Sequence, residues 1–257
     1  MDLCNLSPAE VTRYARQITL EDWGREAQQR VKSSRVLIAG AGGLGSAAAL
    51  YLLAAGVGTI CLVDESRVSL ADLGHQFLFR EMDLGKTKVT VAERRLQEIN
   101  PFVLVESRVK AISEHNFSRL TGGSHLLIDA TNNVAARFLL NRAAAKHRIP
   151  LVYAWAWEMN GCLATSWPGQ GPCLACVFPE GSQLGEPALM GPLKGIMGSL
   201  LALEALRILG GLGPALLGRL LTFQGRQFRF EERTMYPDPQ CPVCRGLTSR
   251  GSLRALS

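Results

Sequence analysis

Two pairs of cysteines with the same internal spacing are the residues of this chain best suited to binding a metal ion. Cys173 and Cys176 form one CxxC pair, and Cys241 and Cys244 form the other. A tetrahedral Zn²⁺ site needs four soft ligands about 2.3 Å from the ion, and each CxxC turn can deliver two thiolates. Four thiolates close the coordination shell, so the pattern predicts a structural Zn²⁺ that ties the C-terminal tail to the loop after the central sheet.

A redox function for the CxxC pairs is the competing interpretation. It is weakened because there are two pairs and neither opens a helix in a thioredoxin-like unit. Among the other cysteines, Cys61 and Cys162 lie in apolar segments and are expected to be core thiols, while Cys4 is expected in an exposed tail. Metal ligation rather than a disulfide framework fits a reducing compartment, so we expect a cytoplasmic protein.

A glycine-rich turn at residues 40–45 is the second feature that could do chemistry. It follows a short apolar run at 35–39 and opens an Ala- and Leu-rich segment, the context in which GxGxxG binds a phosphate. The helix that follows would present free N–H groups and a partial positive charge to the anion. Asp64, at the end of the next apolar run, is placed to accept hydrogen bonds from ribose hydroxyls. The glycines expected to bind the cofactor are Gly40, Gly42, Gly43 and Gly45.

Alternating buried strands and helices must position these residues. Strands are expected at 35–39, 59–63, 103–109, 125–129 and 150–157, and helices at 44–55, 86–99 and 134–147. This alternation predicts an α/β fold with a doubly wound, mostly parallel Rossmann-like sheet. After residue 161 the pattern changes to an antiparallel elaboration with strands at 162–167, 220–224 and 227–231 and a long apolar helix at 192–209.

The organisation expected is a single nucleotide-binding domain over 1–257. It consists of an N-terminal helical arm at 1–30, a Rossmann-like core at 31–160, and C-terminal strands, helix and zinc knuckles at 161–246. A length of 257 residues with 47% hydrophobic residues is enough for one full core. No run of about 20 apolar residues predicts a membrane span, and the first residues do not form a secretory signal. The net charge of +6 comes from scattered Lys and Arg, so an anionic ligand is expected rather than nucleic acid.

Motifs along nearly the whole chain resemble those of the MoeB/ThiF/HesA adenylyltransferases, bacterial relatives of the ubiquitin-activating enzymes. The resemblance runs from about residue 14 to about residue 246, and it favours ATP over NAD in the pocket, which the glycine turn alone does not decide. The motifs that carry it, besides the glycine turn and the cysteine knuckles, are Tyr14-Ala-Arg16-Gln17, Val68-Ser-Leu-Ala-Asp72-Leu-Gly-His75-Gln76, Leu84-Gly85-Lys-Thr-Lys88, Ile99-Asn100-Pro101, Asp129-Ala-Thr-Asn132-Asn133 and Gly191-Pro-Leu-Lys-Gly-Ile-Met-Gly198.

The resemblance implies an ATP-dependent activation of a small ubiquitin-like sulfur carrier protein. The C-terminal Gly-Gly carboxylate of the carrier attacks the α-phosphate of ATP, AMP joins the carboxylate, and pyrophosphate leaves. It further implies that Asp64 holds the ribose, that Lys88 contacts phosphate and that Gln76 lies in the pocket with Asn133. Arg16 is expected to reach the phosphates from the partner subunit of a homodimer, and Mg²⁺ is expected beside ATP.

Three site residues depart from the family pattern. His75 stands where the family usually has an arginine, and Asn132 stands where it has the aspartate that holds Mg²⁺. Asp72 stands where it has an asparagine, so a carboxylate and an amide are exchanged. We hypothesise that Asp72 has taken over the metal-holding role, because Mg²⁺ prefers at least one carboxylate oxygen. Independent drift in a decayed site is the alternative.

The departures leave a second function open. A catalytically weakened relative would keep the fold and act as a nucleotide- or carrier-binding module. The segment before Gly191 contains no cysteine, so a thioester or persulfide relay through such a residue is not expected. Arg137 is expected on a solvated helix face, and Trp155 and Trp157 in core or dimer packing rather than in a substrate groove.

Overall fold

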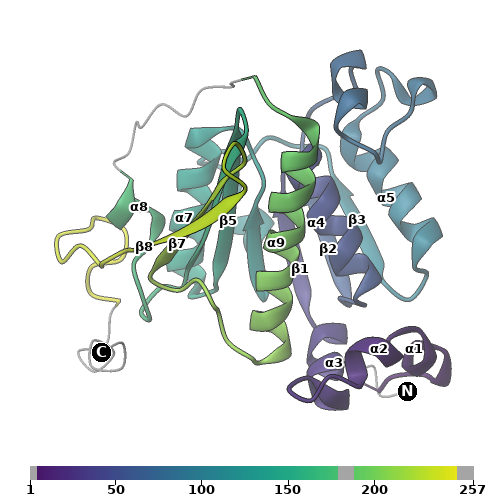
Figure 1. Ribbon diagram of the computed structural model, residues 1–257, viewed down its shortest axis with the longest axis horizontal. Coiled ribbons are helices and arrows are strands. Elements are labelled where there is room, and N and C mark those ends of the chain that lie inside the picture. Colours follow the sequence, from purple (N-terminus) through teal and green to yellow (C-terminus); the bar gives the residue numbers. More distant parts are fainter. Residues whose placement is uncertain (1–4, 179–187, 248–257) are drawn as a thin grey trace.

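A single sheet of eight strands forms the centre of the computed structural model, which describes residues 5–178 and 188–247 (Figure 1). The strand order is β3-β2-β1-β4-β5-β6-β7-β8. The strands from β3 to β5 pair in parallel, and those from β5 to β8 pair in antiparallel fashion. The predicted Rossmann-like sheet with an antiparallel C-terminal extension is therefore confirmed. The strands are β1 (Arg35–Ala39), β2 (Thr59–Val63), β3 (Leu104–Arg108), β4 (Leu126–Asp129), β5 (Leu151–Trp157), β6 (Asn160–Ser166), β7 (Arg219–Gln224) and β8 (Arg229–Thr234).

Helices cover both faces of the sheet, with short helical segments between them. The expected helices at 44–55, 86–99, 134–147 and 192–209 all form, with ends within two residues of those predicted. The N-terminal arm breaks into three helices, and four short segments were not anticipated. The helices are α1 (Pro8–Arg13), α2 (Ala15–Ile18), α3 (Gly24–Lys32), α4 (Gly43–Ala54), α5 (Lys88–Ile99), α6 (Phe117–Thr121), α7 (Val134–His147), α8 (Leu174–Val177) and α9 (Gly191–Gly210), with 3₁₀ turns η1 (Leu70–Gly74) and η2 (Glu81–Asp83).

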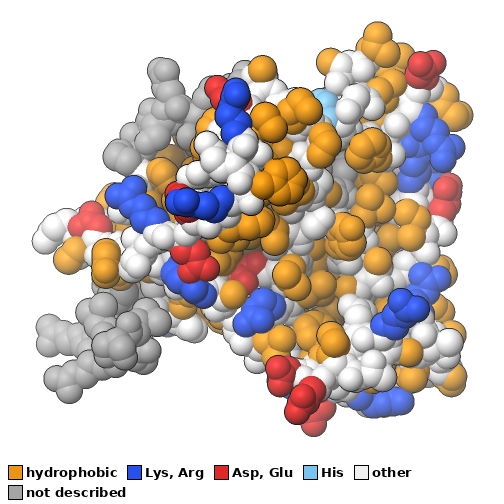
Figure 2. All heavy atoms as spheres, in the orientation of Figure 1, with side chains coloured by type: hydrophobic (Ala, Val, Ile, Leu, Met, Phe, Trp, Pro, Cys, Tyr) orange, Lys and Arg blue, Asp and Glu red, His pale blue; other side chains and the backbone are white. Residues whose placement is uncertain are grey.

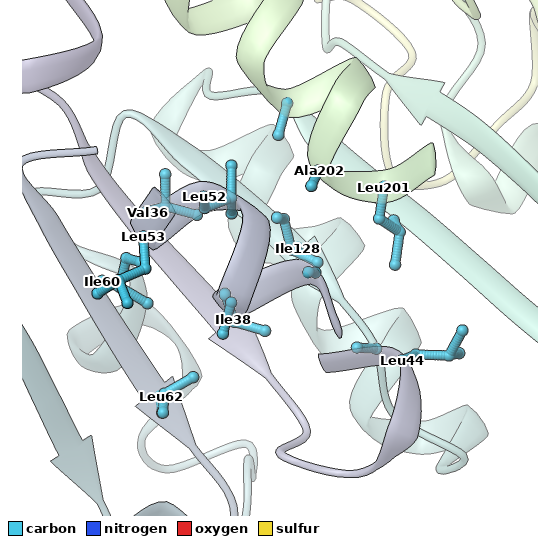
Figure 3. Packing of buried hydrophobic residues seen from close by; sticks show 14 of the residues in the cluster. Val36, Ile38, Leu44, Leu52, Leu53, Ile60, Leu62, Ile128, Leu201 and Ala202 are labelled. Carbon is cyan, nitrogen blue, oxygen red and sulfur yellow. The ribbon is translucent and has the colours of Figure 1, made fainter. Parts of the chain in front are cut away.

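The parallel strands are apolar on both faces, and successive residues therefore enter two different cores. On β1, Val36 and Ile38 pack with α4, α5 and α9, whereas Leu37 and Ala39 pack with α7. Figure 3 shows the first of these cores, in which Ile38 lies between side chains of α4, β2 and β4. Because both faces of these strands are buried, the position of each strand in the sheet is fixed. The loop residues that follow each strand are therefore held at a defined place.

The longest helix, α9, packs along α4. A Cβ on Gly198 would lie 2.6 Å from the carbonyl oxygen of Leu44, so only a glycine allows this approach. Because Gly198 meets the first turn of α4, and later α9 residues follow α4 along the sheet, the two helices run in the same direction (Figure 1). Their N-termini therefore lie at the same end of the sheet.

The surface carries no massed basic face in the view of Figure 2, where Lys and Arg alternate with acidic and hydrophobic side chains. Across the described residues, none of the helices is both long enough and apolar enough to cross a membrane.

Candidate functional site

A cavity of about 1190 Å³ opens at the carboxyl ends of the parallel strands. Its walls come from the loops after β1, β2, β3 and β4 and from the end of β5. The chain runs from β1 outward to β3 and then returns to β4 on the other side of β1, so the cavity lies where the strand order reverses. Ligands of open α/β sheets bind at such a switch point.

The cavity is lined by Gly40, Gly42 and Gly43 of the glycine turn, but not by Gly45. Gly40 has a φ of +94°, and a Cβ there would lie 2.6 Å from the carbonyl oxygen of Ala130. A side chain at Gly45 would run into the carbonyl oxygen of Gly40, so the turn tolerates no larger residue at either position. No side chain caps the N-terminus of α4 at Gly42, which leaves the first amide groups of that helix to bind an anion.

Asp64 braces the glycine turn from the end of β2. Its Oδ2 accepts a hydrogen bond from the backbone N–H of Ala41 at 2.8 Å, and its Oδ1 accepts one from Ser66 at 2.7 Å. The side chain is half-buried and lines the cavity. A carboxylate held in this way keeps lone pairs that face the cavity, where ribose hydroxyls would donate.

Asp72, Gln76 and Lys88 form one buried polar cluster in the wall of the cavity. Lys88 Nζ lies 2.9 Å from Asp72 Oδ1, and Gln76 Nε2 donates to the same oxygen at 2.7 Å. The other oxygen, Oδ2, accepts from both the backbone N–H and the hydroxyl of Ser69, each at 2.8 Å. Burial raises the pKa of Asp72, but the hydrogen bonds from Lys88 and Ser69 outweigh it and hold the pKa below its usual value.

These contacts bear on the hypothesis that Asp72 binds Mg²⁺. Both carboxylate oxygens already accept two hydrogen bonds each, and one of them is paired with an ammonium group. The geometry favours a positioning role in which Asp72 orients Lys88 and Gln76. The amide of Gln76 is fixed by its bond to Asp72, and its buried Oε1 has no hydrogen-bond partner among the described residues.

Asn132 and Asn133 both line the cavity at the start of α7, and both are exposed. The two have different surroundings. Asn133 is the N-cap of α7, and its Oδ1 accepts the backbone N–H of Ala136 at 3.0 Å, so part of its role is to start the helix. Asn132, where the resemblance implies a carboxylate, lies on the cavity wall.

Arg137 was expected on a solvated helix face, and that expectation is wrong. It is 3% exposed and forms an ion pair with Asp129, which is fully buried at the end of β4. Its guanidinium also donates to the carbonyl oxygens of Thr131 and Ala154, and lies 5.2 Å from the ring centroid of Trp155. The sequence does show an acid at the end of β4 and an arginine one turn into α7. Only the folded structure shows that Asp129 and Arg137 form an ion pair.

Trp155 and Trp157 line the cavity from β5, rather than serving only as core residues. Trp155 stacks on Trp157 with 6.4 Å between ring centroids, and it meets the edge of Phe178 at 5.0 Å. The expectation of purely core or dimer packing is therefore incomplete, because these rings form one wall of the cavity.

His75 and Lys194 both lie beside Gly43, at the N-terminus of α4. Burial lowers the pKa of His75 below 6.5, and the nearby Lys194 and Lys88 lower it further, against the opposing effect of Asp72. His75 is therefore neutral near pH 7. Lys194 comes from the first turn of α9 and lines the cavity. The sequence prediction did not include Lys194, because its α9 segment reads as an apolar helix.

Arg16 is exposed on α2 and does not line the cavity of its own chain. The segment α1–α3 leads into β1 and so lies at the amino end of the parallel strands, whereas the cavity lies at their carboxyl ends. The expected contact between Arg16 and nucleotide cannot form within one chain.

The four predicted cysteines meet in one cluster, although 68 residues separate Cys173 from Cys241. The Sγ atoms are 3.8 Å apart for Cys173 and Cys176, 3.6 Å for Cys173 and Cys241, and 3.4 Å for Cys176 and Cys244. Four sulfurs at ~2.3 Å from a tetrahedral Zn²⁺ are ~3.8 Å apart, so the observed spacing fits that ion.

Asn141 of α7 anchors the cysteine cluster to the sheet domain. Its Nδ2 lies 3.6 Å from Cys173 Sγ, and its Oδ1 accepts the backbone N–H of Leu174 at 3.1 Å. Asn141 is fully buried, as are three of the four cysteines, while Cys176 is half-buried. An amide donor to a ligand sulfur is a typical outer contact of a metal–thiolate site.

Comparisons with known proteins identify a matching family, relatives of similar sequence and a solved structure of similar fold. The ThiF family matches residues 14–243 of the chain. The vegetative HesA protein of Trichormus variabilis is 40% identical over 244 residues, which cover 94% of this chain and 92% of the relative. The sulfur carrier protein adenylyltransferase of Thermus thermophilus is 37% identical over 246 residues, covering 91% of each. The structure of E. coli MccB with ATP shares the fold, with a TM-score of 0.83 at 22% identity over 95% of this chain and 76% of that one.

Proposed function

The chain belongs to the ThiF family, and we propose that it is an ATP-dependent adenylyltransferase that activates the C-terminal Gly-Gly carboxylate of a small ubiquitin-like sulfur carrier protein. The observation that carries this proposal is the cavity at the switch point of the sheet, where the glycine turn, Asp64 and Lys88 converge. The relative named a sulfur carrier protein adenylyltransferase supports the choice of reaction and of carrier.

The reaction asks the protein mainly for alignment and for neutralisation of phosphate charge. A carboxylate oxygen of the carrier attacks the α-phosphorus, the bond from that phosphorus to the bridging oxygen breaks, and pyrophosphate leaves with the electron pair. The uncapped amides at the start of α4 would hold phosphate oxygens, and Asp64 would accept hydrogen bonds from the ribose. Lys88, held in place by Asp72, would stabilise the charge that develops on the phosphates.

The residues predicted to hold Mg²⁺ fit that ion poorly, because Asp72 is engaged in an ion pair and Asn132 offers only an amide. Asp64 and Glu65 also line the cavity and form no ion pair among the described residues, but Asp64 is engaged with the backbone of the glycine turn. Hard cations prefer carboxylate oxygens. We therefore derive no step through a protein-held Mg²⁺, and we propose that any Mg²⁺ enters with the phosphates of ATP.

We propose further that the active unit is a homodimer in which Arg16 enters the cavity of the partner subunit. Its exposure on α2, away from the cavity of its own chain, supports this. Mixing an Arg16→Ala chain with a Lys88→Met chain gives the test. In the mixed dimer one cavity has both residues, so activity should return to a fraction of the wild-type value. Chains that stay inactive when mixed, or that are monomers at micromolar concentration with full activity, would contradict the dimer.

ATP–pyrophosphate exchange with candidate carriers that end in Gly-Gly tests the reaction. Exchange should require the carrier, should stop when its last glycine is deleted, and should fall at least tenfold in Lys88→Met. Binding of ATP and carrier without exchange would overturn the adenylyltransferase and leave a binding module, the alternative that the uncharged His75 and Asn132 favour.

A further inference from the structure

Trp155 and Trp157 form a raised aromatic wall on one side of the cavity. The last residue of β1, Ala39, is level with Asp129 at the end of β4, and Asp129 is level with Tyr153 of β5. Because β5 continues to Trp157, the two tryptophans stand two and four residues past that level. At ~3.3 Å per residue, they rise about 7 and 13 Å above the ends of the neighbouring strands.

The rings of this wall are held in place by one another and by residues behind them. Trp155 meets the edge of Phe178 with 5.0 Å between ring centroids, and it stacks on Trp157 at 6.4 Å. The guanidinium of Arg137 lies 5.2 Å from the ring centroid of Trp155. The attraction of the Trp155 ring for a cation is therefore already used, and the wall favours an uncharged ligand group.

Leu189 continues the wall beyond the end of β5. It forms a parallel bridge with Glu158, the residue after Trp157, and the N–H of Glu158 donates to the carbonyl oxygen of Ala188 at 2.8 Å. Leu189 lines the same cavity as the two tryptophans. The side of the cavity next to β5 is therefore bordered by a continuous apolar surface.

The strand order leaves the two substrates of the proposed reaction on different sides of β1. Asp64, which would hold the ribose, follows β2 on one side, whereas the tryptophans belong to β5 on the other. The phosphates would lie between them, at the uncapped start of α4. The side toward β5 is therefore left for the carrier tail, whose carboxylate must reach the α-phosphorus.

The width of this side corresponds to a short length of extended peptide. The strand β5 is separated from β1 by β4 alone, and neighbouring strands are ~4.8 Å apart, so the wall stands about 10 Å from the glycine turn. An extended chain advances ~3.3 Å per residue, so about three residues cover that distance. The two glycines are the first two of these residues. The wall therefore meets the residue directly before Gly-Gly, the first position that can carry a side chain.

We propose that Trp155 and Trp157 bind the side chain of the carrier residue directly before Gly-Gly and select a large uncharged apolar residue, such as leucine or phenylalanine, at that position. This inference rests on the proposed function, because it names a substrate preference of the same site. An apolar side chain is removed from water when it packs on the rings, whereas a charged side chain would give up its hydration against an apolar surface.

ATP–pyrophosphate exchange tests this preference. The probe is a small ubiquitin-like protein that supports exchange in the assay above, prepared in four forms with Phe, Leu, Lys or Asp directly before Gly-Gly. With the wild-type chain, kcat/KM should be roughly ten- to hundredfold higher for the Phe and Leu forms than for the Lys and Asp forms. In Trp157→Ala the ratio should fall below about threefold, mainly through a higher KM for the two apolar forms, because uniform binding is what is lost.

Two further variants separate a direct contact from a general loss of structure. Trp157→Glu should raise kcat/KM for the Lys form above that for the Asp form, a gain that misfolding cannot produce. Trp167→Ala is the matched control, because Trp167 is also half-buried but is not one of the residues that line the cavity, and it should keep the wild-type ratio. Titration calorimetry should give the same ATP affinity for all these proteins.

The outcomes distinguish this inference from the function on which it rests. Equal kcat/KM for all four carrier forms in the wild type, or a wild-type ratio kept in both Trp157→Ala and Trp155→Ala, would overturn the role of the wall and leave the adenylyltransferase intact. A wild-type chain that supports exchange with no carrier would overturn the proposed function together with this inference.

Discussion

The cavity and the cysteine cluster are both built from polar groups, but they are stabilised in opposite ways. In and beside the cavity, three acids have partners from the chain itself: Asp64 has backbone amides, Asp72 has Lys88, and Asp129 has Arg137. In the cluster, four thiols face one another, with 3.4 to 3.8 Å between the sulfurs of three pairs, and the side-chain amide of Asn141 approaches Cys173.

This difference separates two ways of forming a site. The cavity residues are held in place before any ligand arrives, and such preorganisation is what a positioning catalyst needs. The four thiolates would repel one another without a cation between them, so the cluster gains its stability from the metal. We therefore expect loss of the metal to destabilise only the C-terminal part of the chain. Loss of an ion pair at the cavity should lower both the free energy of unfolding and the affinity for nucleotide.

The largest effect is expected for Cys241→Ser, which removes one ligand of the proposed Zn²⁺. Zinc content by elemental analysis should fall from one per chain to well below one, because apparent zinc binding of about 10 kcal/mol or more depends on a full shell. Hydrogen exchange should increase in residues 168–178 and 235–247 and stay unchanged in residues 35–63. Cys162→Ala, a buried cysteine outside the cluster, should keep its zinc. Wild-type protein without zinc would contradict the site.

The next effect is expected for Arg137→Met, which leaves Asp129 without its ion-pair partner. Both side chains are almost fully buried, with 3% and 0% exposed, so the free energy of unfolding should fall by about 3–5 kcal/mol. Adding Asp129→Asn should recover part of this loss, since the unpaired charge is then removed. Urea unfolding of the two single variants and the double variant measures the coupling. Strictly additive losses would show that the pair contributes nothing beyond its separate members.

A smaller effect is expected for Asp72→Asn, whose pair with Lys88 retains exposures of 13% and 11%. The stability loss should be about 1–3 kcal/mol, less than for a fully buried pair. The exposed pair of Arg219 and Glu232 provides the control, because Glu232→Gln should change stability by less than about 0.5 kcal/mol.

The same Asp72→Asn variant decides between positioning and metal binding. If Asp72 orients Lys88, ATP affinity should fall by a similar factor with and without Mg²⁺. If Asp72 instead held the metal, the substitution would abolish the Mg²⁺ dependence and leave Mg²⁺-free binding unchanged. Titration calorimetry of both proteins in Mg²⁺ and in EDTA measures the difference.

The sequence predicted the fold well because each parallel strand is a short apolar run followed by a turn. It predicted the glycine turn and the cysteine grouping for the same reason, since both are encoded in local spacing. It did not predict Lys194 or the burial of Arg137. Those positions depend on contacts between segments distant in sequence, where α9 approaches α4 and where α7 returns to the end of β4.

The roles of the site residues show the same difference between local spacing and contacts of distant segments. Asp64 and Lys88 lie in the cavity where the resemblance placed them, yet the engagement of both oxygens of Asp72 depends on Ser69, Gln76 and Lys88 arriving together. The two bonds from Ser69 follow the local Ser-x-x-Asp capping pattern, but the bond from Lys88 requires α5 to pack against this turn. A residue exchange can be read from the sequence, but its consequence depends on neighbours that only the folded chain assembles.

The smallest effect concerns the pH dependence of stability around His75. Burial, Lys194 and Lys88 lower its pKa in the folded chain below the ordinary 6.5, against the opposing carboxylate of Asp72, while Gln76 also lies beside the ring. As the pH falls below 6.5, the unfolded chain therefore binds a proton before the folded chain does. The contribution of His75 to stability is complete above pH 6.5 and is lost as the pH falls toward the folded pKa.

His75→Gln should remove this part of the pH dependence, and Lys194→Met should reduce it, because the ring then faces one cation fewer. Urea unfolding of the three proteins at about pH 7.5 and about pH 5.5 compares the losses. The wild type should lose the most stability between the two conditions, Lys194→Met less, and His75→Gln the least. An unchanged loss in Lys194→Met would mean that its ammonium group does not act on His75, and so lies farther from the N-terminus of α4 than the contact with Gly43 requires.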